Sequence, residues 1–137
     1  MSKQNERENH KISTHTAALL LLIASADESI ENSESYIIND IITDFFKLNK
    51  EMTELVIQDA KQIIQKSTDI YHIANYLNSV FDREDKVDLL YCIFEVAFAD
   101  KEFHYMERHM INQIMNIMNI DKTEIIKAKR DLNDLLL

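Results

Sequence analysis

The sequence predicts an all-α fold, a compact bundle of about seven helices with an internal pseudo-twofold repeat. Glycine and proline are both absent from the 137 residues, which disfavours β-hairpins and glycine-rich phosphate loops. Apolar residues recur at helical spacing, and no stretch alternates for long enough to form a strand. Two segments that begin near residues 24 and 97 also resemble each other, which indicates a duplicated unit.

The first predicted helix is the most apolar part of the chain. Residues 1–12 are polar without an apolar period, so we expect a flexible leader there. A helix from about Ser13 to Ala26 should follow. Because residues 19–23 are apolar on every face, this helix should be central and buried. After a polar turn, a second helix should run to about Lys47 with an isoleucine-rich stripe.

The remaining helices are delimited by polar residues that can cap them. A third helix should follow Asn49 and turn residues such as Met52 and Leu55 inward. Ser67 and Asp82 can cap the fourth and fifth helices, and the fifth should extend to about residue 99. A sixth should cover about residues 105–119, and a capping box formed by residues 121 and 124 should open the seventh. We therefore expect a single helical domain over 13–137, with repeat units at about 13–66 and 83–137.

The charge and cysteine content limit the classes of partner and location. The net charge is −9 and the pI is near 4.9, so nucleic-acid binding is disfavoured, while cations or basic protein surfaces fit. A single cysteine, Cys92, lies in an apolar run and indicates a buried thiol in a reduced, cytoplasmic setting. The run before Ala24-Ser25-Ala26 imitates a signal peptide, but Glu6 and Glu8 argue against that alternative. It is also too short for an integral membrane segment.

The two related segments share a spaced acidic pattern. Ala26-Asp27 is followed by Glu34, and Ala99-Asp100 is followed by Glu107, with both pairs 73 residues apart. Each unit therefore contains an apolar helix, an Asp, a Glu seven residues later and an amphipathic helix. Two such units should pack about a pseudo-twofold axis with their apolar helices at the centre.

These residues resemble the repeated Ala-Asp-Gly-x-apolar-x-x-x-Glu motif of the TerB (tellurite resistance) family, over roughly residues 13–130. The resemblance implies an all-helical binding or scaffold module of the kind known from bacterial tellurite-resistance and stress-response systems. It also implies divalent-cation binding at the acidic positions and no catalysis. The glycine that follows each Asp in the motif is Glu28 in the first copy and Lys101 in the second.

The acidic turns have two interpretations. A Ca²⁺ or Mg²⁺ site needs several oxygen ligands, which the turns offer. The candidate ligands are Asp27, Glu28, Glu31, Glu34, Asp100, Glu102 and Glu107. Alternatively, the same carboxylates only cap helices and satisfy loop amides, because the first turn of a helix favours a negative charge. Duplication copies caps and ligands alike, so both interpretations stay open.

The expected function follows from these alternatives. We expect a non-enzymatic module whose acidic turns engage a divalent cation or a basic protein partner. The alternative is a purely structural interaction domain without a metal. A small hydrolase that uses Asp27 and Glu34 is a remote third possibility, since no triad, Cys–His pair or phosphate loop emerges. Glu95, within the apolar fifth helix, should lie at the edge of its buried stripe.

Overall fold

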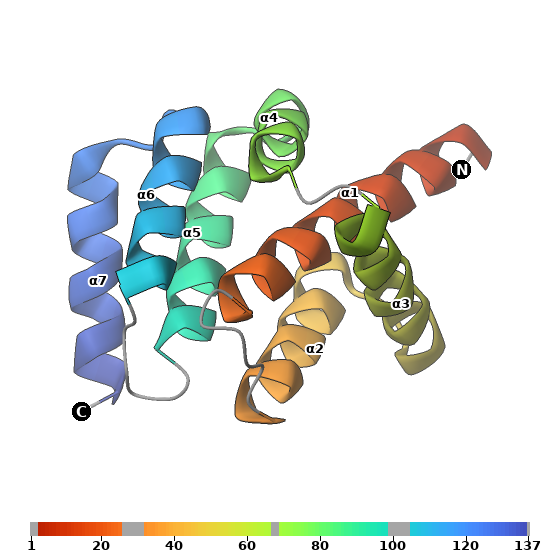
Figure 1. Cartoon of the computed structure of the whole chain (residues 1–137), viewed down its shortest axis with the longest axis horizontal. Helices are drawn as coiled ribbons and strands as arrows, with labels where there is room; N and C mark the ends of the chain where they lie inside the picture. Colours follow the sequence, from red (N-terminus) through yellow and green to blue (C-terminus); the bar gives the residue numbers. More distant parts are fainter. Residues whose placement is uncertain (1–2, 26–31, 67–68, 99–104, 137) are drawn as a thin grey trace.

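The computed structural model describes residues 3–25, 32–66, 69–98 and 105–136, and the side chains of residues 6–25, 36–66, 69–98 and 108–132. Over these residues the chain forms seven helices and no strand, which confirms the all-α prediction (Figure 1). The helices are α1 (Lys3–Ala24), α2 (Asn32–Phe46), α3 (Lys50–Lys66), α4 (Ile70–Val80), α5 (Arg83–Ala97), α6 (Tyr105–Ile117) and α7 (Lys122–Leu136).

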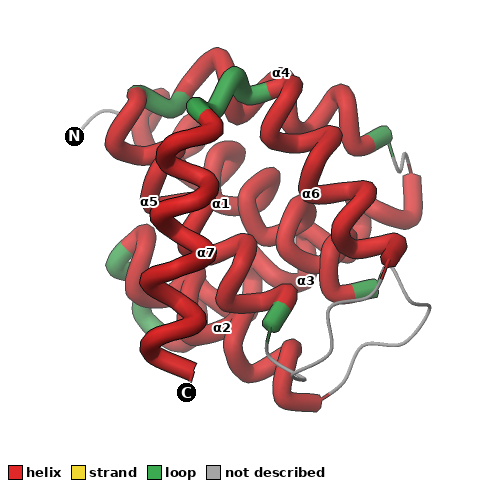
Figure 2. Tube along the Cα trace, turned by 90° about the vertical axis from the view of Figure 1, so that its left-hand side faces the viewer, coloured by secondary structure: helices red, strands yellow, loops and turns green. Residues whose placement is uncertain are grey.

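Helix α1 forms the centre of the fold. It packs against α2, α3, α4, α5 and α6, and residues 17–24 are buried from every side. Helix α5 contacts α1, α2 and α7, and Figure 2 shows α7 in the foreground. The prediction that the apolar helix after residue 13 is central is therefore confirmed.

The predicted start of the first helix was wrong, because α1 begins at Lys3 and residues 3–12 are helical. No Gly or Pro interrupts this segment, and it has contacts to hold it. Ile12 packs against the core, and His10 hydrogen-bonds to Asp59 on α3. Ser13, the expected first residue, is buried, and its hydroxyl donates to the carbonyl of Asn9 one turn earlier.

Side-chain caps begin several of the helices. Asn49 Oδ1 accepts the backbone N–H of Met52 at 2.8 Å, and Asp82 Oδ1 accepts that of Asp85 at 2.8 Å, as predicted. Helix α4 is capped by Asp69 and not by Ser67, which lies outside the described residues. The side chain of Asp121 accepts the N–H of residue 123 at the start of α7.

The predicted capping box at α7 was wrong in its second half. The Glu124 carboxylate accepts a hydrogen bond from the Arg83 guanidinium at 2.9 Å, and this ion pair joins α7 to the start of α5. The inward face predicted for α3 was also wrong in part. Met52 and Leu55 are exposed, whereas Thr53 and Val56 are buried.

Two helix ends share one backbone geometry. Lys47 after α2 and Asn119 after α6 have φ of 53° and 54°, the left-handed conformation that usually favours glycine. The next residue in each case, Leu48 or Ile120, donates its N–H to the carbonyl five residues earlier and packs against the core. This is a Schellman motif in both places. The shared geometry is compatible with the predicted repeat, which stays a prediction because the acidic turns fall outside the described residues.

Candidate functional site

The acidic turns proposed as metal sites lie largely outside the described residues. Asp27, Glu28, Glu31, Asp100 and Glu102 are in segments whose structure is not described. Glu34 and Glu107 lie within helices, each as the third residue of α2 or α6, but their side chains are not described. Both backbone positions are in a first helical turn, which suits a cap and a ligand alike. Among the described residues, no group of three or more His, Cys, Asp or Glu could hold a metal ion.

A second acidic region is fully described and joins α2 to α5. We define the acidic face as Asp40 and Asp44 on α2 with Asp88 and Glu95 on α5. All four side chains are exposed, and helices α2 and α5 pack together. None of the four carboxylates forms an ion pair with another described residue. Burial of part of Glu95 and the charges of Asp40 and Asp44 raise the pKa of the Glu95 carboxyl.

Cys92 lies one turn from the acidic face carboxylates on α5 and is mostly buried. Burial, with smaller contributions from Glu95 and Asp88, raises the pKa of the thiol to about 12. A nucleophilic cysteine needs the opposite, a lowered pKa in an electropositive environment. The structure thus gives Cys92 the packing role that the sequence predicted.

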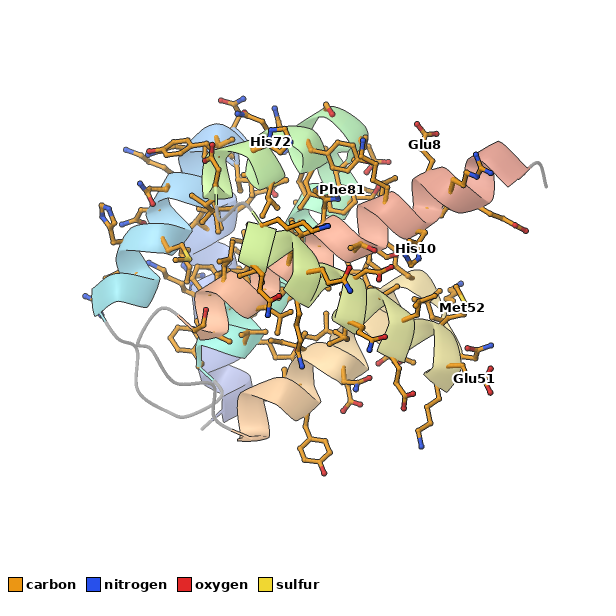
Figure 3. The ribbon with its side chains drawn as sticks, turned by 45° about the vertical axis from the view of Figure 1, so that its right-hand side comes forward. Glu8, His10, Glu51, Met52, His72 and Phe81 are labelled. Carbon is orange, nitrogen blue, oxygen red and sulfur yellow. The ribbon has the colours of Figure 1, made fainter. Side chains whose placement is uncertain are left out.

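The crossing of α1 and α3 contains a pair that the sequence did not predict. His10 Nε2 and Asp59 Oδ2 are 2.8 Å apart, and both side chains are partly exposed. Figure 3 shows His10 on the side of α1 that faces α3, whereas Glu8 projects from the other side. The two residues are far apart in the chain, so no spacing rule joins them. Their pairing requires the helical residues 3–12 that the sequence analysis assigned to a leader.

A cavity of about 630 Å³ opens beside this pair, between α1, the end of α2 and the start of α3. Phe45 and Phe46, whose ring centroids are 4.8 Å apart, form part of its apolar wall. Met52, labelled in Figure 3 at the start of α3, adds an exposed apolar side chain. The cavity has the size and partly apolar lining of small-molecule sites. Nothing among its contacts selects one ligand class.

Another cluster lies between α1 and α4. The His15 ring packs on the Tyr76 ring with centroids 4.5 Å apart, and the Lys11 ammonium lies 4.6 Å from the centre of the same ring. His15 Nδ1–H donates to the Lys11 carbonyl at 2.7 Å. Burial lowers the pKa of His15 despite this hydrogen bond, and the nearby charges of Lys11 and His72 act in the same direction. Its environment therefore favours the neutral form of the His15 ring.

Over the described residues the fold is an all-helical module with the apolar helix α1 at its centre and an acidic face on α2 and α5. The family model for tellurite resistance protein TerB matches residues 13–130, and the chain belongs to this family. Comparisons with curated proteins and with solved structures found no match. Family membership confirms the resemblance that the Ala-Asp…Glu segments carried.

No helix among the described residues combines the length and the apolar character that a membrane span needs. The apolar half of α1 is instead covered by five other helices.

Proposed function

We propose that this TerB-family chain is a non-enzymatic binding module that engages the basic surface of a protein partner through its acidic face. The observation that supports it is the set of exposed carboxylates on α2 and α5 that lack cationic partners among the described residues. A chain of net charge −9 attracts positively charged surfaces, and such charges steer and specify association. The raised pKa of Glu95 reflects, in part, the repulsion that a basic partner would relieve.

A Lys- and Arg-rich synthetic peptide tests the acidic face. The triple variant Asp40→Asn/Asp44→Asn/Glu95→Gln should bind the peptide about tenfold more weakly than the wild type, because charged contacts of this kind each contribute up to about 1 kcal/mol. Fluorescence anisotropy of the labelled peptide measures the change. Binding should weaken further when salt is raised.

The matched control removes three carboxylates elsewhere and changes the net charge equally. Glu6→Gln/Glu8→Gln/Glu51→Gln neutralises exposed side chains on α1 and α3 that are not part of the acidic face. It should leave the affinity within about twofold, since only distant charge is lost. Equal weakening in both triple variants would mean that the peptide responds to net charge alone, and the acidic face would lose its role.

A divalent cation bound by the acidic turns, at about residues 27–34 or 100–107, is the second candidate. It is favoured by the placement of Glu34 and Glu107 at the same position of α2 and α6. Calorimetric titration with Ca²⁺ or Mg²⁺ should give saturable heat with the wild type. Glu34→Ala should weaken binding by about tenfold or more, whereas Asp40→Ala on the same helix should not. Absence of heat with both ions would contradict the cation site and leave the carboxylates of the acidic turns as helix caps.

The cellular setting is proposed from family membership alone. We place the module in the cytoplasm of a bacterial tellurite-resistance or stress-response system, where it acts as a scaffold without chemistry of its own.

A further inference from the structure

A basic groove lies between α1 and the second half of α3 in this otherwise acidic protein. Its volume is about 310 Å³, and its charged walls include Arg7 and Lys11 from α1 and Lys66 from α3. Asp59 also lines the groove, but its carboxylate is already bound by His10 at 2.8 Å. Three of the fifteen Lys and Arg side chains thus converge where one carboxylate is already engaged.

The cations of the groove are available to a ligand. Arg7 and Lys66 are exposed, and neither forms an ion pair with a described residue. Lys11 lies over the Tyr76 ring, an interaction that occupies one side of the ammonium and leaves N–H donors for another acceptor. Glu8 projects from the other side of α1 than His10 (Figure 3). However, burial and the charge of Glu8 raise the pKa of Tyr76, so Glu8 lies near this ring and offsets part of the charge of Lys11.

A buried hydroxyl beside the groove lacks a hydrogen-bond partner. Thr14 lines the groove and is 4% exposed, and its Oγ1 has no partner among the described atoms. The neighbouring buried hydroxyls behave differently, because Ser13 donates to the Asn9 carbonyl and Thr16 to the Ile12 carbonyl. A buried polar group without a partner is unfavourable, and a hydrogen bond to a bound ligand is one way to satisfy it. Thr14 can donate to an acceptor that enters from the groove after a small movement.

We propose that this groove binds a small anion that carries a phosphate group. A guanidinium and two ammonium groups from two helices match the several oxygens and the double charge of phosphate better than they match a single carboxylate. The groove is at the lower end of the size of small-molecule sites. The net charge of −9 repels a long polyanion, so a nucleic acid is not its occupant. The proposal is independent of the acidic face, which lies on α2 and α5.

Inorganic phosphate is the probe for the groove. Two-dimensional NMR of the full chain, in a phosphate-free buffer of constant ionic strength, should show saturable amide shifts at residues 7–15 of α1 and 59–66 of α3. Lys66→Gln should weaken the apparent affinity about tenfold, in keeping with the loss of one charge-assisted hydrogen bond. Thr14→Val keeps the shape of the side chain and removes the donor, and it should weaken binding in the same direction.

The control is Lys61→Gln, on the same helix and also exposed, but outside the groove. It should leave phosphate affinity within about twofold, because phosphate contacts in the groove do not involve it. Glycerol phosphate, as a second probe, should bind at least as well as inorganic phosphate if an organic phosphate is the natural occupant. Shifts that stay linear with phosphate concentration, or an equal loss in the Lys61 and Lys66 variants, would overturn the proposal.

Discussion

Replacing Leu20 by alanine should lower the free energy of unfolding by about 2–5 kcal/mol. Leu20 lies in the central part of α1, is fully buried and belongs to the helix that contacts α2 to α6. Removing its branched end loses the transfer free energy of three carbon atoms and leaves a cavity that five packed helices cannot close. Urea unfolding followed by far-UV circular dichroism measures the change, with similar m-values required for a valid comparison.

The matched control is Leu55→Ala on α3. Leu55 is 45% exposed, so the same chemical change should cost less than about 1 kcal/mol. The pair also tests the corrected orientation of α3, since sequence analysis turned Leu55 inward. Similar losses of stability in the two variants would show that Leu55 belongs to the core and that the exposed face of α3 has been misassigned.

Much of the helical pattern was predictable because local signals agree with tertiary packing. The apolar run in α1 occupies every face of the helix, so other helices must cover it on all sides and α1 must be central. Asn49 and Asp82 act as caps because a short polar side chain just before a helix can accept a backbone N–H of the first helical turn. These signals need no information about distant parts of the chain.

The errors arise where a distant contact decides the outcome. Residues 3–12 carry no apolar period, and α3 stabilises them as helix through the pairing of Asp59 with His10. Thr53 can be buried because its hydroxyl hydrogen-bonds to that of Thr43 on α2 at 2.9 Å, and its neighbour Met52 is exposed. Glu124 binds Arg83 instead of its own helix end. The spacing of residues in the sequence does not reveal any of these three pairs, because each joins two different helices.

The candidate sites divide in the same way. The metal sites in the acidic turns were predicted from a short repeated motif, and most of their residues lie outside the described part of the chain. The acidic face and the basic groove depend on which helices pack together, because each takes charged side chains from two helices. A sequence gives the charges of each helix, whereas the faces that meet are set by the packing of α1 with α3 and of α2 with α5.

Cys92 should react with iodoacetamide at pH 8 about a thousandfold more slowly in the folded protein than in the urea-unfolded chain. The reactive species is the thiolate, and a pKa of about 12 leaves roughly one thiol in ten thousand ionised at this pH. A thiol with the ordinary pKa near 9 is ionised to roughly one part in ten. Mass spectrometry of timed, quenched samples measures both rates.

The same raised pKa determines how stability changes at alkaline pH. The folded state keeps the Cys92 proton between about pH 9 and 12, while the unfolded chain releases it, so this contribution is intact below pH 9 and is lost as the pH rises toward 12. Cys92→Ala should therefore flatten the alkaline fall in the free energy of unfolding. Tyr76 and Tyr91, whose pKa values are also raised, remain in the variant and set the residual slope. Rapid alkylation of the folded wild type would place a thiolate in this site and contradict the buried, electronegative setting beside Asp88 and Glu95.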